Sequence, residues 1–400
     1  MPGAEGEPAG RPRHGFSLDL GAGVALRLRE PHHVGPYSEL VARNNVRLAA
    51  APVGLVPAGS AGAGAHTDLA LAEFVAGTGW EADLVVGGAL WGAVRLRGLR
   101  AASGSVELGY WLAAGADPDL ALVAVTGAVR QAFAVPGVAR VCLRQGAADG
   151  EGARVAAAVG FRLEAVLRRA QATVGGDIVD QAVHGLLREE FADATPVAAA
   201  GRRFAMPVDA GLELALPERG DAGEVSTLAA RNREQLRPWM PWADSISPAA
   251  QLSFIEGRAL PAVRSGDGFE ALIVERGRVV GMAGLHSVDP AARSGALGYW
   301  LDDERRGRGV VTRCVRAIVA RCFESGACGG RPFERVEIQA GAENAPSRAV
   351  AERLGFALEG VVRHDQSVGG TDLDMAVYGL LRGEWRAGGG AGGGAGGAAS

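Results

Sequence analysis

The chain has 400 residues, of which 48% are hydrophobic, and its formal net charge at pH 7 is −4. This length predicts two or three domains, each large enough to bury its own core. The slightly acidic balance provides no basic surface, so we expect no nucleic-acid partner. No apolar run approaches the roughly 18 residues that a membrane helix needs, and no signal peptide is evident. We therefore expect a cytoplasmic protein without a membrane partner.

Both ends of the chain are biased in composition. Residues 1–15 are rich in Gly and Pro, and residues 387–400 are almost wholly Gly and Ala, so both segments are expected to be disordered. The cysteines at positions 142, 314, 322 and 328 show no C-x-x-C spacing. This spacing favours neither a zinc site nor a disulfide framework, and we expect no metal.

The chain repeats itself over a long interval. Residues 40–44, 108–112, 159–161 and 185–191 echo residues 228–232, 297–301, 354–356 and 379–385. Such a long repeat predicts a duplicated domain rather than a solenoid. We expect a first domain at 16–192, a linker at 193–210 marked by prolines and alanines, and a second domain at 211–386.

In the second copy, apolar and polar residues alternate over 212–216, which predicts a strand. Helices are expected at 222–236 and 251–263, followed by a hairpin of strands 269–275 and 278–286 around Gly277. A strand at 295–301, a helix over 315–323, a strand at 335–340 and a helix at 347–354 come next, before strands at 357–366 and 373–381. This order predicts an α/β fold, with a mixed sheet flanked by helices.

A glycine-rich segment, Arg305 to Thr312, lies between the strand at 295–301 and the following helix. Such a turn directs backbone N–H groups to one place, where the helix dipole also favours negative charge. It lacks the ending of a P-loop and the G-x-G-x-x-G of a dinucleotide fold. The segment therefore predicts a pyrophosphate site of another kind.

Arg306-x-x-Gly309 resembles the coenzyme A signature R/Q-x-x-G-x-G/A of the GCN5-related N-acetyltransferases (GNATs). Val311 stands at the last position, where the RimJ/RimL ribosomal-protein acetyltransferases commonly carry a larger residue. Further blocks resemble that subgroup in the expected order over roughly 211–386: residues 232–242, 297–301, 344–356 and 378–381. The resemblance implies two tandem GNAT-like domains, each with a splayed mixed sheet.

The resemblance also implies roles for individual residues. Acetyl-CoA would be the co-substrate and would pass its acetyl group directly to a primary amine in a ternary complex. The residues matching coenzyme A-binding positions are Trp300, Leu301, Arg306, Gly307, Arg308, Gly309, Val311 and Thr312. Asn344 matches a residue near the pantetheine, and Ser347 matches one that donates a proton to the sulfur or orients it. Ser347 could instead be only a helix N-cap, and the two arginines only solvated turn residues.

The acceptor side is less defined. Some RimL-type enzymes carry a glutamate base where this chain has Gln366, an amide that cannot accept the proton. The work of the base could fall to water, to Glu270 or to His286, whereas His364 and Asp365 would need a bulge to face the site. Trp239, Trp242 and His286 are candidate acceptor-binding residues, although each could also be a core residue.

The acceptor itself stays open at this point. It is an amine, such as the N-terminal α-amine of a ribosomal or other protein. A small, antibiotic-like amine is an alternative. A catalytically lapsed sensor or scaffold that binds coenzyme A is another, because of Gln366.

The first copy lacks this chemistry. Its counterpart of the glycine-rich loop contains Asp117, Pro118 and Asp119, which remove a donor and would repel a pyrophosphate. Gly152 stands where the second copy has Ser347. We therefore expect a degenerate first domain that packs on the second as an intramolecular pseudo-dimer and shapes its acceptor cleft.

Overall fold

The computed structural model describes residues 16–52, 54–57, 60–191, 204–324 and 331–386. The expected disordered ends and most of the expected linker lie outside these residues. The predicted linker is too long at its C-terminal end, because residues 205–209 form a strand, β9. This strand pairs with β10, Leu212–Ala215, and thus belongs to the second domain.

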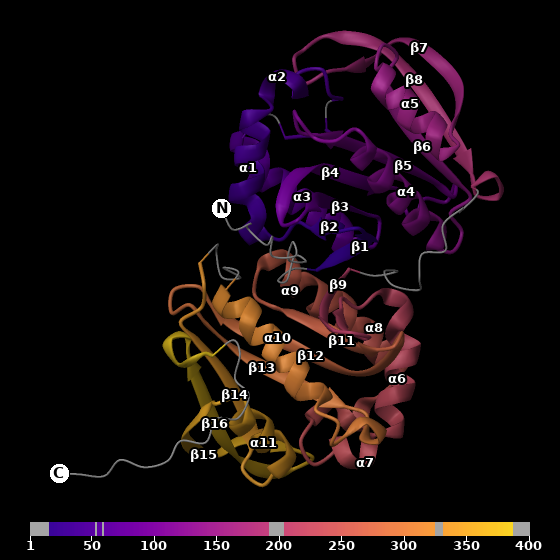
Figure 1. Cartoon of the computed structure of the whole chain (residues 1–400). Coiled ribbons are helices and arrows are strands. Elements are labelled where there is room, and N and C mark those ends of the chain that lie inside the picture. The colour runs from indigo at the N-terminus through magenta and orange to yellow at the C-terminus, as the bar shows by residue number, and fades with distance from the viewer. Residues whose placement is uncertain (1–15, 53, 58–59, 192–203, 325–330, 387–400) are drawn as a thin grey trace, which may run out of the picture.

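Within the described residues, sixteen strands form one continuous mixed sheet, and the predicted α/β class is confirmed. The strand order is β15-β16-β14-β13-β12-β11-β10-β9 in the second half and continues as β1-β2-β3-β4-β5-β6-β8-β7 in the first half. The two halves therefore share one topology and meet at their N-terminal strands (Figure 1).

The first half contains β1 (Ser17–Gly21), β2 (Val24–Leu28), α1 (Val34–Arg43), α2 (Asn45–Leu48), α3 (Ala63–Ala76), β3 (Gly79–Val86), β4 (Ala89–Arg97), β5 (Ser105–Leu112), α4 (Asp119–Ala134), β6 (Arg140–Gly146), α5 (Gly150–Val159), β7 (Arg162–Ala172) and β8 (Ile178–Leu187). The second half follows with β9 (Ala205–Asp209), β10, α6 (Ala222–Arg231), α7 (Arg233–Leu236), α8 (Pro248–Phe254), α9 (Leu260–Ser265), β11 (Phe269–Glu275), β12 (Arg278–Asp289), β13 (Ser294–Leu301), α10 (Val310–Glu324), β14 (Arg335–Gly341), α11 (Ala345–Arg353), β15 (Ala357–Val368) and β16 (Thr371–Leu381).

Two predicted helices are interrupted. The helix expected at 222–236 is split at Asn232, whose backbone departs from helical geometry with φ −99° and ψ 11°. The side-chain amide of Asn232 donates a hydrogen bond to Asp302 at 3.0 Å. The helix expected at 251–263 begins earlier, at Pro248, where Ser247 caps it. A π-helical turn, Ile255–Ala259, then separates α8 from α9. It precedes Pro261, which has no N–H to donate to the helical ladder.

Helices cover both faces of the second half's sheet. On one face, α10 packs its apolar side into the main core with β12, β13 and β14. On the other face, α6 packs with Leu272, Met282 and Trp300 in a smaller cluster. No helix within the described residues is both long and apolar enough to span a membrane.

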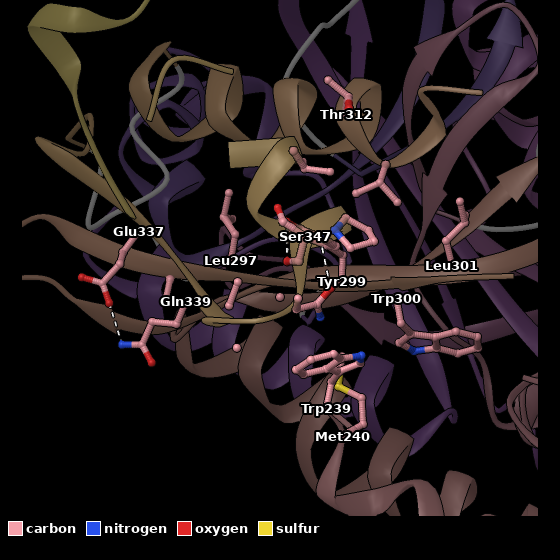
Figure 2. A pocket seen from close by; sticks show the side chains of 18 of the residues that line it. Trp239, Met240, Leu297, Tyr299, Trp300, Leu301, Thr312, Glu337, Gln339 and Ser347 are labelled. Atoms are coloured by element: carbon pink, nitrogen blue, oxygen red, sulfur yellow. Dashed lines mark hydrogen bonds between the residues drawn. The ribbon is translucent and has the colours of Figure 1, made fainter. Parts of the chain in front are cut away.

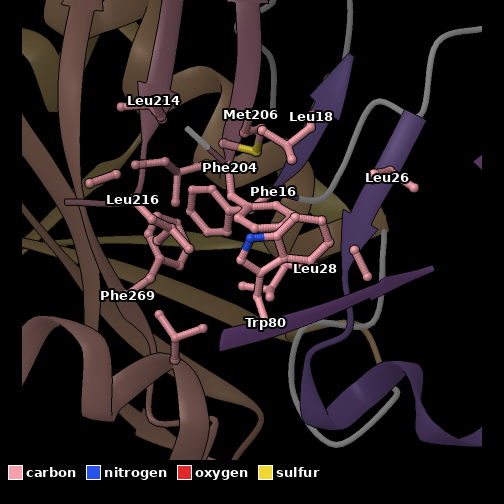
Figure 3. Close-up of a cluster of buried hydrophobic side chains, with 14 of the residues drawn as sticks. Phe16, Leu18, Leu26, Leu28, Trp80, Phe204, Met206, Leu214, Leu216 and Phe269 are labelled. Carbon is pink, nitrogen blue, oxygen red and sulfur yellow. The ribbon is translucent and has the colours of Figure 1, made fainter. Parts of the chain in front are cut away.

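The two halves share one hydrophobic core at their junction. The rings of Phe16 and Phe269 meet edge to face at 5.0 Å, and Phe204 packs against Trp80 at 5.6 Å (Figure 3). Among the described residues, strand pairing across the junction is limited to Ser17 with Ala205. Side-chain packing therefore contributes more to this junction than the strand ladder does.

A buried ion pair also crosses the junction. Glu30 in the first half pairs with Arg321 on α10, and their exposed fractions are only 6% and 1%. The guanidinium carbon of Arg321 lies 5.2 Å from the ring centres of both Phe16 and Phe269. A second inter-half pair, Asp68–Arg264 at 2.9 Å, lies on the surface.

Candidate active site

The strands β13 and β14 diverge in the second half. They pair in parallel from Ser294–Arg335 to Leu297–Ile338 and no further. The gap opens into a cavity of about 1350 Å³. Its walls are the ends of β13 and β14, the loop before α10 and the first turns of α10 and α11. The splay expected for residues 297–301 is therefore present.

The glycine-rich loop lies at one end of this cavity. Gly307 and Gly309 have φ values of 73° and 70°, a left-handed geometry that glycine adopts at little cost. The first backbone bond into α10 runs from the Arg313 N–H to the Gly309 carbonyl, at 3.0 Å. The amides of the preceding turn therefore have no intrahelical acceptor. All residues from Arg306 to Thr312 line the cavity.

Asn232 fixes the start of this loop. Its side-chain oxygen accepts the Asp303 N–H at 2.8 Å, and its amide donates to Asp302. Arg306 bonds Asp303 at 3.2 Å, and about half of its side chain is exposed. The arginine is thus held at the cavity mouth, where it can still reach an anion.

The expected roles of Ser347 and Asn344 separate in the structure. Asn344 is the N-cap of α11, because its side-chain oxygen accepts the Ser347 N–H at 3.3 Å. The interpretation of Ser347 as an N-cap is therefore wrong, since the residue sits in the first turn. Its hydroxyl lies 3.1 Å from the Tyr299 hydroxyl (Figure 2). Burial raises the pKa of Tyr299 to about 12, so this phenol stays protonated.

The contact between Tyr299 and Ser347 was not predicted from the sequence. Strand alternation could have indicated it, because Tyr299 must point to the opposite face from Trp300. Trp300 faces α6, whereas Tyr299 faces α11 and Ser347. The tyrosine and the serine are 48 positions apart in the sequence, so no local motif joins them.

Aromatic side chains form the other end of the cavity. Trp239 and Met240 line it together with Trp300 and Leu301 (Figure 2). The Trp239 ring covers Gly341, where an added Cβ would lie 2.7 Å from the ring. Trp242, which was also expected at the acceptor cleft, is not among the residues that line this cavity. Trp242 packs behind the wall on Trp300, with ring centres 5.9 Å apart, because the turn at 241–245 directs it into the smaller core cluster.

Comparison with known proteins identifies this arrangement. A family model described as an acetyltransferase (GNAT) domain matches residues 212–357. A putative ribosomal N-acetyltransferase of Bacillus subtilis, YdaF, is 32% identical over 186 residues, which are 46% of this chain and 97% of that protein. The chain belongs to the GNAT acetyltransferases. As a GNAT it is an acetyl-CoA-dependent acyltransferase, and acetyl-CoA is its co-substrate.

Two further proteins are also similar to this chain. The ribosomal-protein-serine acetyltransferase of Escherichia coli is 23% identical over 44% of this chain and 94% of its own length. A crystal structure of a probable acetyltransferase is 31% identical, with a TM-score of 0.43, and the match covers 46% of this chain and 99% of that one.

The GNAT cavity has the donors that coenzyme A requires. Free amides of the first turn of α10, together with Arg306 and Arg308, suit a diphosphate. The unpaired edges of β13 and β14 suit an amide-bearing arm such as pantetheine. Ser347 lies beyond this edge and faces into the same cavity.

Gln366, at the position where some relatives of the RimL type carry a base, and its neighbour Asp365 both line the cavity. β15 is bulged between Val362 and Gln366, and His364 has a φ of 53°. Because of this bulge, Asp365 lines the cavity beside Gln366. His286 of β12 lines it as well, and burial, followed by the charge of Arg258, lowers its pKa, so the imidazole is neutral.

The first half keeps the framework of this site without its donors. Asn44 holds the loop start, as Asn232 does, by accepting the Ala114 N–H at 2.7 Å. In the loop itself, the carboxylate of Asp117 accepts the Asp119 N–H at 3.0 Å. The Asp117 carboxylate thus occupies a backbone N–H donor of the loop and adds a negative charge there. Gly152, in the first turn of α5, offers no hydroxyl to a neighbour.

Proposed function

We propose that the second half acetylates the N-terminal α-amine of a protein, such as a ribosomal protein, by direct transfer from acetyl-CoA in a ternary complex. One observation carries this proposal: a single cavity extends from the loop amides to the aromatic wall of Trp239. Both substrates would therefore share one space, and proximity would supply much of the rate. Two relatives are named as ribosomal acetyltransferases, which supports this class of acceptor. A ribosomal acceptor would place the enzyme in the cytoplasm.

Each residue of the cavity has a role in this proposal. The amides of residues 310–312 and the arginines at 306 and 308 hold the diphosphate, and Asn344 fixes the first turn of α11. The Ser347 hydroxyl donates its proton toward the departing sulfur, and Tyr299, 3.1 Å away, orients that hydroxyl.

Polar side chains of β14 also line the cavity. The Gln339 amide donates to Glu337 at 2.7 Å, and both line the cavity (Figure 2). Their oxygens can accept hydrogen bonds from an ammonium group and a peptide N–H. Gln366 adds an amide that can orient the acceptor without taking its proton. These groups suit a peptide N-terminus.

The test is a panel of acceptors. Synthetic peptides with N-terminal Ser, Ala, Thr or Met and an aminoglycoside would be incubated with acetyl-CoA, and thiol release and product mass would be measured. We expect acetylated peptides whose modification maps to the α-amine. Turnover on the aminoglycoside alone would favour a small-molecule enzyme. Tight binding of acetyl-CoA without any turnover would favour a sensor, the alternative that Gln366 suggests.

We further propose that residues 16–192 are a degenerate copy of the second domain and form an intramolecular pseudo-dimer with it. The shared strand order and the common core at the junction support this proposal. Every described residue that lines the cavity lies between positions 235 and 375, so the first half supplies none of the lining. Its influence on the cleft would act through packing. A fragment of residues 201–386 that is soluble, monomeric and fully active would refute the proposal.

A further inference from the structure

Glu270 stands in one row with two glycines across the sheet. The register pairs Glu270 of β11 with Gly284 of β12, and Gly284 with Gly298 of β13. Paired residues of adjacent strands share a face, and this is the face covered by α6. Gly298 lines the cavity. Within this row, no side chain therefore stands between the Glu270 carboxyl group and the cavity.

Neighbouring side chains approach the backbone closely at Gly284 and Gly298, so a residue with a Cβ would not fit there without a shift. A Cβ added at Gly284 would clash with Oε2 of Glu270. A Cβ added at Gly298 would lie 3.0 Å from Nε2 of His286. The carboxyl thus occupies the space that a side chain at position 284 would fill. The imidazole occupies the space at position 298, over the strand that borders the cavity.

The carboxyl group of Glu270 has no hydrogen-bonded or ion-paired partner among the described residues. The charged group that acts on it is Arg258, from the π-helical turn packed over this face, and the other titratable group nearby is the neutral His286. Burial raises the pKa of Glu270 to about 7, against a weaker lowering by Arg258. Such a carboxyl group is a stronger base than an exposed one.

The equivalent row of the first half is built differently. Glu81 of β3 pairs in register with Arg95, and Arg95 with Gly109. An arginine thus replaces the central glycine, and its Nε lies 3.8 Å from the Glu81 carboxylate. Arg29 and His66 also bind that carboxylate, at 2.6 and 2.8 Å. Burial is the largest influence and would raise the pKa of Glu81, but the charges and hydrogen bonds of Arg29 and His66 together outweigh it, and the net shift is downward.

We propose that Glu270 is the general base of the second half and accepts the proton of the acceptor ammonium across Gly284 and Gly298. The inference rests on the proposed acetyl transfer. One ammonium N–H bond breaks and its proton goes to Glu270, and the freed amine forms a C–N bond with the acetyl carbon. The C–S bond breaks, the thiolate takes the Ser347 hydroxyl proton, and the second proton that the nitrogen loses restores the Ser347 hydroxyl. Glu81, at the same position of the other half, is neutralised by arginines and serves only structure.

The test compares four variants of the full chain with an N-terminal-serine peptide as acceptor. We expect Glu270→Gln to lower kcat about 100-fold or more and to remove the acid limb near pH 7 that the wild type shows. The affinity for acetyl-CoA and the far-UV spectrum should stay unchanged, which excludes misfolding. Asp365→Asn and His286→Gln test the other groups at the cavity, and Glu81→Gln is the matched control in the first half. These three should keep the acid limb.

A rate within fivefold of wild type for Glu270→Gln would overturn the inference, as would loss of the acid limb in Asp365→Asn or His286→Gln instead. If the wild type itself acetylates no amine, the proposed function fails separately. In that case the protonation of Glu270 is followed as a function of pH by its carboxyl infrared band, taken from the difference between the wild-type and Glu270→Gln spectra. Titration near pH 7 supports its assignment as a base, and titration near the ordinary value for glutamate contradicts it.

Discussion

Replacing Glu30 by glutamine should weaken the junction between the halves. The change keeps the size of the side chain but removes the negative charge that Arg321 faces. Arg321 is 1% exposed and lies between two phenylalanine rings, so water cannot solvate its guanidinium. Removing the charge of one partner of a buried ion pair typically lowers the free energy of unfolding by about 3–5 kcal/mol, because the other charge stays buried. We expect the free energy of unfolding to fall by about that amount.

Urea denaturation measures this loss. Tryptophan fluorescence is a suitable signal, since Trp80 packs on Phe204 within the junction. Asp68→Asn is the matched control, because it breaks the exposed inter-half pair with Arg264, and solvent screening makes such pairs nearly neutral. A change below about 1 kcal/mol for Glu30→Gln, or equal effects of the two variants, would refute the importance of the buried pair.

Three further outcomes are expected. Gly309→Asp should weaken acetyl-CoA binding at least 10-fold by calorimetry, because it places a carboxylate beside the free amides, whereas Gly115→Asp in the first half's loop should not. Ser347→Ala should lower kcat by roughly 10- to 100-fold at unchanged acetyl-CoA affinity, and Tyr299→Phe should lower it less, in steady-state kinetics. Stability should decrease as the pH falls from about 6.5 to about 4, because burial lowers the pKa of His32 to about 4 and the unfolded chain takes up its proton first. A His32→Gln variant should flatten that decrease in thermal denaturation across the same pH range.

The sequence predicted those parts of the site that depend on local geometry. The loop from Arg306 to Thr312 was predictable because two glycines before an apolar helix determine both the turn and its free amides. The splay after Leu297 followed from resemblance to a family. By contrast, Asn344 rather than Ser347 caps α11, and residue types alone could not rank two good capping residues three positions apart.

Other features depend on contacts between distant segments. The unpaired state of Glu270 follows from glycines on two neighbouring strands and from a π-helical turn, none of which a single-sequence pattern identifies. Trp242 was misplaced because its neighbour, Trp300, comes from a strand far along the chain. The continuous sheet could not be predicted either, because one residue pair, Ser17 with Ala205, joins the two halves of the ladder.

The covalent union of the halves changes how their junction responds to concentration. A dimer of separate subunits dissociates on dilution, whereas in the proposed pseudo-dimer the partner surface would be present at a fixed effective concentration. Specific activity should therefore be independent of enzyme concentration down to the nanomolar range. In the proposed pseudo-dimer the two halves would also be free of symmetry, so that an arginine can stand at position 95 while glycine stands at position 284.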